Sequence, residues 1–229
     1  MNSELRNALD INLVSASGGE PGSASAARDW WLRTLLVLQR PRPVFVALRD
    51  DTKEAAGDRA EPILLIVILA GIAGVLTTGT AAHLMDDGSY DGLLIAIWAF
   101  IVGSIYGTFG YYVVGALLHW SGRALGSQGS YRRARHVVAF AAVPIGLSLV
   151  LWPVKLSLYG TDWFRTGGRD TGSGGAVFDL LTYAFFLWGA MLLVIGVRAV
   201  HGWTWSRALA ATALAIVAPI VVAVLLGTV

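Results

Sequence analysis

The sequence contains no cysteine. This absence excludes disulfide frameworks, thiolate metal sites, cysteine nucleophiles and palmitoylation. Charged residues are also scarce, at 14% of the 229-residue chain, whereas about 25% of a soluble globular domain is charged. Together with a mean hydropathy of +0.63, this deficit predicts that lipid surrounds much of the chain.

What the chain does contain is long apolar runs. Five of them are long enough to cross the hydrocarbon core of a bilayer, which takes about 20 helical residues. They lack the alternation of period two that barrel strands show, and in lipid each segment must pair its own backbone groups. The sequence therefore predicts an all-α integral membrane protein, a bundle of about five transmembrane helices. The expected spans are 62–82, 93–118, 137–158, 176–197 and 208–228.

The residues before the first span do not have the pattern of a signal peptide, because charges and a Ser/Gly/Ala run take the place of its apolar core. We expect 1–27 to be a disordered cytosolic tail and 28–61 to be an amphipathic segment. The part 30–48 is apolar in places but contains three arginines, each of which would cost about 2.5–3.5 kcal/mol at the bilayer centre. It is therefore not a sixth span. It either lies in the membrane interface or packs on the cytosolic face.

Basic residues are distributed unevenly between the two sets of loops. Ten lie on the side that includes the N-terminal segment, and two lie on the other side. This asymmetry predicts a cytosolic N-terminus and an external C-terminus. The excess of arginine over lysine, fifteen to two, is typical of a GC-rich bacterial genome and favours a bacterial cell membrane. The ten are Arg42, Arg49, Lys53, Arg59, Arg123, Arg132, Arg133, Arg135, Arg198 and Arg207, and the two are Arg165 and Arg169.

Ionisable side chains are missing from the middle of every expected span, so a proton- or ion-coupled transporter would lack its usual relay. Lys155 lies near the outer end of the third span, where it can extend toward water; a binding role is the alternative. The chain has no P-loop, HExxH or GxSxG motif. We therefore expect no enzyme, cofactor or metal, and a net charge of +2 does not indicate a nucleic-acid partner.

Small residues recur every fourth position in three of the spans, a spacing that lets helices approach closely in lipid. Packing within one bundle explains them, and a homo-oligomer is the alternative. Pro144 and Pro153 are expected to break the third span, because proline removes a backbone hydrogen bond and clashes with the preceding turn. The small residues are Ala70, Gly74, Thr78, Gly103, Gly107, Ala211 and Ala215.

The cytosolic loop between the second and third spans is rich in Gly and Ser and ends in a basic helix start. Its arginines hold the loop inside and meet anionic lipid headgroups, at about 1 kcal/mol per charge. They are also candidates for contact with a protein partner. The candidate partner or lipid contacts are Arg123, Tyr131, Arg132, Arg133, Arg135 and His136.

Two short motifs resemble the Yip1 family. The first is the Gly-rich stretch 122–131 followed by Arg-Arg-Ala-Arg and an aromatic–x–x–x–Pro pattern at Phe140 and Pro144. The second is Pro-Arg-Pro-Val-Phe-Val-Ala-Leu at 41–48, which is similar to an element of bacterial members and contains Pro41 and Phe45. The resemblance covers about 30–229 and implies a Yip1-like five-helix domain at 62–229, with these four residues in structural roles.

The resemblance also limits what function can be expected. Eukaryotic Yip1 members associate with Rab-type GTPases and the vesicle traffic machinery, partners that a bacterial cell lacks, and the family pattern supplies no catalytic residues. We therefore expect a non-enzymatic membrane organiser or adaptor that acts through its cytosolic face, with a protein partner that the sequence does not identify. The alternative is a channel, permease subunit or small-solute transporter built around the broken third span.

Overall fold

The computed structural model describes residues 21–167 and 172–227, with side chains placed for 29–167 and 172–217. These residues form helices and connecting turns, with no strand among them, which confirms the all-α prediction. Three segments are long and apolar enough to cross a membrane, and α5 and the part of α11 with placed side chains, Trp205–Val217, are shorter apolar helices. The three segments are Gly92–Ala124, Tyr131–Phe164 and Ser173–His201.

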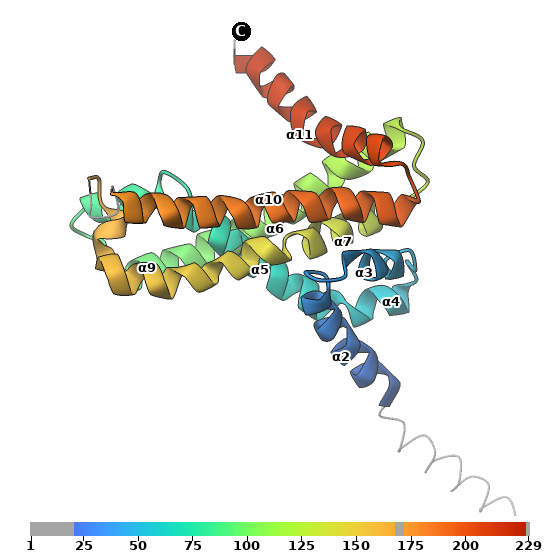
Figure 1. Ribbon diagram of the computed structural model, residues 1–229, viewed down its shortest axis with the longest axis horizontal. Coiled ribbons are helices and arrows are strands. Elements are labelled where there is room, and N and C mark those ends of the chain that lie inside the picture. Colours follow the sequence, from blue (N-terminus) through green and yellow to red (C-terminus); the bar gives the residue numbers. More distant parts are fainter. Residues whose placement is uncertain (1–20, 168–171, 228–229) are drawn as a thin grey trace, which may run out of the picture.

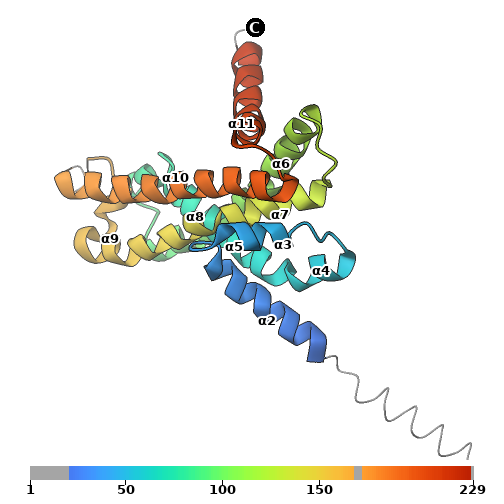
Figure 2. The same cartoon turned by 45° about the vertical axis from the view of Figure 1, so that its right-hand side comes forward.

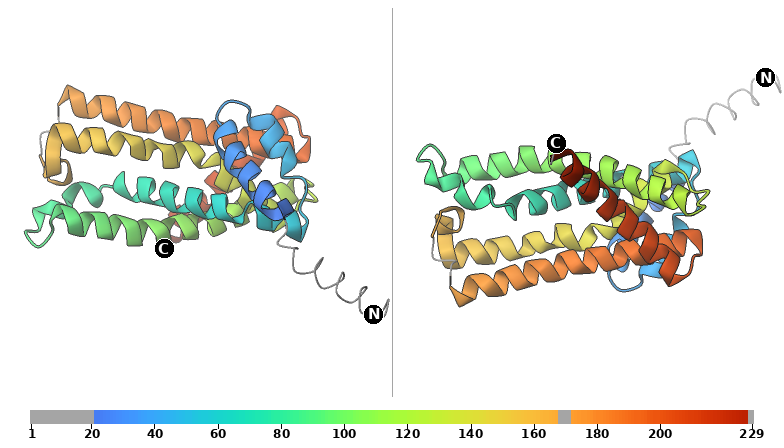
Figure 3. Two further views of the ribbon diagram at one scale, coloured as in Figure 1. Left: turned by 90° about the horizontal axis from the view of Figure 1, so that it is seen from below. Right: turned by 90° about the horizontal axis from the view of Figure 1, so that it is seen from above.

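Four helical rods lie side by side along the long axis of the molecule (Figures 1 and 3). Apolar composition on all sides is what a rod surrounded by lipid and by other rods requires. The third rod consists of several short helices in succession. The rods are α5 (Ala60–Leu76), α6 (Gly92–Ala124), the series α7 (Tyr131–Ala141), α8 (Val143–Leu147), η2 (Ser148–Val150) and α9 (Leu151–Tyr159), and α10 (Ser173–His201).

The first rod is shorter than the sequence predicted, because α5 ends at Leu76 and not near residue 82. The hydroxyls of Thr77 and Thr78 donate to the carbonyls of Gly74 and Val75, both at 2.7 Å. Such local bonds offer the backbone an alternative to the helix. After this turn the chain forms the 3₁₀ helix η1 (Ala81–Asp86).

Proline interrupts the third rod, as the sequence predicted. Pro144 lies in the first turn of α8 and Pro153 in the first turn of α9. A proline nitrogen has no hydrogen to donate, and the first turn of a helix is where that loss is least costly. The rod thus continues in one general direction but as separate short helices, and η3 (Gly160–Phe164) ends it.

Helices α5 and α6 approach each other closely at their glycines. A methyl group built on Gly71 would lie 2.1 Å from the carbonyl oxygen of Gly103, and one on Gly107 would lie 2.2 Å from that of Val67. No side chain fits at those distances. The small residues predicted to mediate helix packing include Gly103 and Gly107, but Gly71 makes the contact on α5.

The last helix, α11 (Trp205–Gly227), does not join the four rods. It starts against α6 and α10, with Ala208 and Ala211 fully buried, and then rises away from the bundle (Figures 1 and 2). Hydropathy predicted this helix but gave no information about its direction.

The N-terminal segment forms three helices at one end of the bundle: α2 (Pro21–Leu36), α3 (Pro41–Ala47) and α4 (Lys53–Asp58). Helix α2 includes 21–27, which the sequence placed in the tail; residues 1–20 of that tail lie outside the described residues. Helix α3 packs against α10, and Phe45 and Leu48 are buried. The segment 30–48 therefore packs on the bundle through α3.

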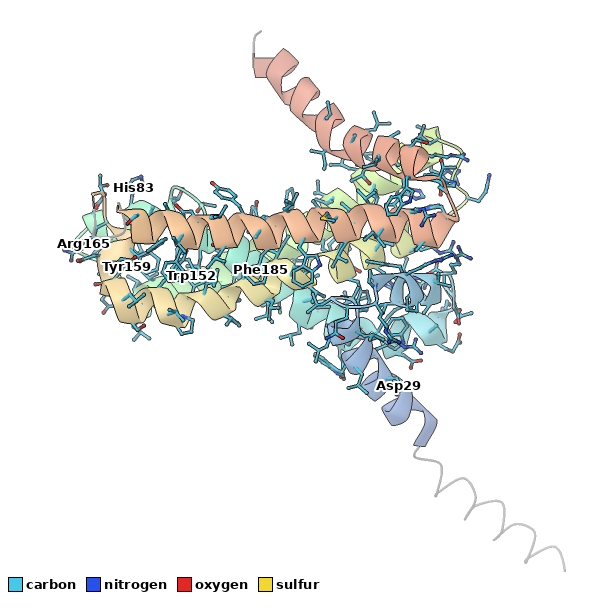
Figure 4. All side chains as sticks on the ribbon, viewed as in Figure 1. Asp29, His83, Trp152, Tyr159, Arg165 and Phe185 are labelled. Carbon is cyan, nitrogen blue, oxygen red and sulfur yellow. The ribbon has the colours of Figure 1, made fainter. Side chains whose placement is uncertain are left out.

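The loops predicted to be basic meet at this same end, which we call the basic end. The guanidinium of Arg49, after α3, bonds to Ala199 near the end of α10. Arg207, at the start of α11, bonds to the Leu125 carbonyl after α6. Helices η1 and η3 pack together at the opposite end, where Figure 4 labels His83 and Arg165.

Candidate functional site

The start of α7, at the basic end, holds most of the residues that the sequence selected. Ser130 precedes this helix, and its hydroxyl accepts a hydrogen bond from the Arg133 backbone at 3.1 Å. A serine at this position satisfies a backbone donor that the first helical turn leaves unpaired. The same hydroxyl also contacts the carboxylate of Asp51, so the cap of α7 is linked to the loop between α3 and α4.

Asp51 is the acceptor around which this loop is held. Arg132 Nε donates to Asp51 Oδ1 at 2.8 Å, and the terminal nitrogen of the same guanidinium donates to the Asp51 backbone carbonyl. A guanidinium can bind two acceptors at once because its donors have a fixed planar arrangement. One arginine therefore fixes both the side chain and the backbone of Asp51.

Two further arginines bind backbone carbonyls across the same end. Arg133 donates to the carbonyl of Arg49 at 2.7 Å. Arg49 in turn donates through Nε and a terminal nitrogen to the carbonyl of Ala199, at 3.1 and 2.6 Å. The chain of contacts runs from α7 through the α3–α4 loop to the end of α10, whose last carbonyls have no partner within the helix.

Arg135 faces aromatic rings. Its guanidinium carbon lies 4.6 Å from the ring centroid of Tyr112, 4.7 Å from that of Tyr131 and 5.2 Å from that of Tyr111. The Tyr131 hydroxyl donates to the Tyr112 carbonyl at 2.8 Å. Stacking on ring faces stabilises a cation by about 0.5–1 kcal/mol at exposed sites and more where water is excluded, so Arg135 connects α7 to α6.

Arg59 is completely buried before α5. It donates to the Asp50 carbonyl at 2.6 Å and lies 5.3 Å from the ring centroid of Trp30. Burial lowers the pKa of Arg59, and the charges of Asp51 and Asp50 only partly oppose this effect. Burial of a guanidinium is costly unless it is paired. The contacts of Arg59 with Trp30 and with the Asp50 carbonyl therefore hold α2 and the α3–α4 loop against the start of α5.

The Asp51 carboxyl keeps its charge in this setting. Partial burial by itself would raise its pKa, but hydrogen bonds from Ser130 and Arg132 and the charge of Arg133 outweigh burial and lower the pKa below the ordinary 3.8. The ion pair between Asp51 and Arg132 is therefore present at neutral pH.

The structure brings five of the six candidate contact residues together and leaves one apart. Tyr131 and the three arginines of α7 lie around the Asp51 loop and the tyrosines of α6, and His136 is buried at 6% exposure. Arg123 is exposed near the end of α6. The sequence analysis missed Asp51 as the acceptor and Arg59 as a buried residue. Their positions before the first span gave a charge signal, but nothing in the sequence indicated that Asp51 pairs with Arg132, 81 residues away, or that Arg59 is buried against Trp30.

The motif residues lie where the elements begin or pack. Pro41 is in the first turn of α3, and Phe45 is fully buried against Gly196 of α10, where a methyl group would lie 2.8 Å from the Phe45 ring. Phe140 is fully buried with its ring centroid 5.5 Å from that of Trp30. Pro144 starts α8 and is also buried. Phe45, Phe140 and Pro144 thus belong to the interior, whereas Pro41 is half-buried.

Helix α2 presents an apolar surface that the bundle does not cover. Leu32 and Leu35 are 62% and 64% exposed, and Trp31 and Leu36 are each more than a third exposed. Arg40 and Arg42, which follow this helix, are exposed as well. We call the four apolar side chains the α2 face.

Comparison with known proteins gives a family but no close relative. Neither the curated proteins nor the solved structures contain a match to the chain. The family model of the Yip1 domain matches residues 35–227, a range that starts on α2 and includes the docked α3, the four rods and all of α11. The chain therefore belongs to the Yip1 domain family.

Proposed function

We propose that the protein is a non-enzymatic membrane organiser or adaptor. Its contact surface is the α2 face together with the exposed Arg40 and Arg42 that follow this helix. The supporting observation is that α3, α4 and the Asp51 loop are bound to the basic end, while the α2 face remains exposed. Exposed large apolar side chains grouped on one helix typically mark a protein or membrane contact. Basic residues beside them suit acidic partners or anionic headgroups.

The proposal includes a topology of five spans. Helices α5, α6, α7–α9, α10 and α11 would each cross the bilayer, with the basic end and the N-terminus in the cytosol and the C-terminus outside. Grouping of the basic loops at one end supports this orientation through the preference of arginine and lysine for the cytosolic side. Residence in a bacterial cell membrane is part of the same proposal and rests on residue usage alone.

Photocrosslinking tests the adaptor function in native membranes. A photoreactive amino acid replaces Leu32 or Leu35 on the α2 face, and the control replaces Glu54, which is exposed on α4 at the same end. We expect a discrete protein adduct from the two α2 positions and none from residue 54.

Lys substitution of Arg132, Arg133 and Arg135 together should also weaken the adduct, because lysine lacks the planar fork that binds two acceptors.

The transporter alternative is favoured by one observation, the interrupted third rod. It places the sensitive positions at Pro144, Pro153 and Lys155. Should Pro144→Ala or Lys155→Ala abolish solute flux in proteoliposomes, while the photoprobes at Leu32 and Leu35 capture no protein, the adaptor proposal is wrong.

A further inference from the structure

A lysine is buried at the end of the bundle opposite the basic end. Lys155, on α9, is 2% exposed. Its ammonium nitrogen lies 3.9 Å from the ring centroid of Trp163 and 4.8 Å from that of Trp152. Figure 4 shows Trp152 near this end of the molecule. The rings hold the ammonium in one place and stabilise its charge.

Lys155 lines a cavity of about 330 Å³. Asp179 of α10 lines the same cavity, as do Thr77 and Thr78 at the end of α5 and Thr182 on α10. One cation and one carboxylate thus face a common space, with hydroxyl groups around them. Asp179 is exposed, so the cavity is accessible from outside the bundle.

An apolar groove of about 510 Å³ adjoins this cavity. Thr77, Thr78 and Phe186 line both spaces. Residues of α5, α6, α7, α8 and α10 form the groove, and many are small. Both volumes lie in the range of about 300–1,000 Å³ that is typical of small-molecule sites. The small residues include Gly71, Gly74, Gly107, Gly110, Ala142 and Ala190.

The polar groups lie near one end of the bundle, where the proposed topology puts lipid headgroups. Lys155 is on the last helix of the third rod, and Asp179 is in the second turn of α10, which places it about 9 Å from the start of that helix at 1.5 Å per residue. The apolar groove extends from these groups toward the middle of the bundle. A charged end and an apolar body in this order match the two parts of a phospholipid.

We propose that the groove binds one phospholipid that carries both a phosphate and an ammonium group. The phosphate faces Lys155, the ammonium faces Asp179, and acyl chain lies along the small residues. A cation and a carboxylate that line one cavity are complementary to a zwitterionic headgroup, whereas a net anionic headgroup would meet the repulsion of Asp179. Helix α11 of a second copy of the chain is a less suitable occupant of the groove, because residues 205–227 contain no acidic side chain that could face Lys155.

Native mass spectrometry of the full-length protein in detergent tests this proposal. Phosphatidylethanolamine, phosphatidylcholine or phosphatidylglycerol is added, and the fraction with one bound lipid is measured. We expect one tightly bound phosphatidylethanolamine and weaker binding of phosphatidylglycerol. Lys155→Gln should weaken phosphatidylethanolamine binding about tenfold, because a charge-assisted hydrogen bond to the phosphate is lost, and Lys155→Arg should restore part of it. Asp179→Asn should reduce the preference over phosphatidylglycerol.

Matched controls separate this site from general lipid contact. Lys53→Gln removes the other lysine of the chain, at the basic end, and should leave binding unchanged. Ala190→Phe fills the groove and should reduce the binding of all three lipids, whereas Ala184→Phe, exposed on the same helix and outside the groove, should not. Equal binding by the wild type, Lys155→Gln and Ala190→Phe overturns the proposal. A dimer that is lost in Ala190→Phe and binds no lipid overturns it in favour of a second copy.

Discussion

At the scale of single residues, the basic end shows why arginine predominates there. Arg132 binds a side chain and a backbone carbonyl together, Arg133 and Arg49 bind carbonyls, and Arg135 stacks on tyrosines. A lysine ammonium would keep each charge but could not reproduce the planar contacts. Arg132 and Arg133, which the charge asymmetry of the loops explains as topological signals, therefore also bind the N-terminal segment.

Neutralising Asp51 should release this segment. Because the pKa of Asp51 is lowered in the folded protein, its contribution is complete above pH ~4 and is lost as the pH falls through the lowered value. At pH 7 the Asp51→Asn variant should show the faster backbone amide exchange in this loop that the wild type shows only in strong acid. We expect backbone amides of 49–52 to exchange several-fold faster, as loss of a bond worth about 1 kcal/mol implies, measured by hydrogen–deuterium exchange in detergent.

The neighbouring carboxyl provides the control for this change. Asp50 accepts a bond from the backbone of Thr52 but none from Arg132, so Asp50→Asn should alter only that local turn. Equal exchange in Asp51→Asn and Asp50→Asn would mean that the Asp51–Arg132 pair does not hold the loop.

At the scale of helices, the α5–α6 contact depends on glycines with no room for a side chain. Gly107→Ala should push α5 and α6 apart, because the new methyl group would meet the Val67 carbonyl, and overpacking of this kind costs about 1–3 kcal/mol. Gly110→Ala is the matched change on α6, since no atom lies within 4 Å of a methyl group there. Thermal unfolding in detergent should show a lower midpoint for Gly107→Ala alone. Two equal midpoints would refute the close contact.

The helices also show which features the sequence could predict. Apolar length indicated the helical segments, and proline positions indicated the breaks at Pro144 and Pro153, because both signals act within a few residues. The early end of α5 depends on two threonine hydroxyls that bond to the preceding turn, and hydropathy does not register such bonds. The pairing of Asp51 with Arg132 joins residues 81 apart in sequence, and charge alone does not select one partner among many arginines.

At the scale of the whole molecule, the two ends of the bundle differ in charge, and this difference predicts the side of the membrane on which each lies. The chain has no cysteine, so single cysteines can be introduced without background labelling. Cysteines at positions 27 and 52 should react only from the cytosolic side. A cysteine at Ser89, in the loop between η1 and α6, should react only from outside. Labelling of 27 and 52 from opposite sides would make 30–48 a sixth span.

The location of the C-terminus depends on α11, which leaves the bundle (Figure 1). Its 23 residues extend about 34 Å at 1.5 Å per residue, enough to cross a core of about 30 Å only when the helix is not strongly inclined. Its apolar sequence has no charge after Arg207, so lipid on all sides of the helix is favourable. In the bilayer α11 can therefore lie parallel to the other rods at little cost in free energy. We therefore expect a reporter fused after Val229 to be active only outside the cytosol. Cytosolic activity would mean that α11 lies along the membrane surface and that the bundle has four spans.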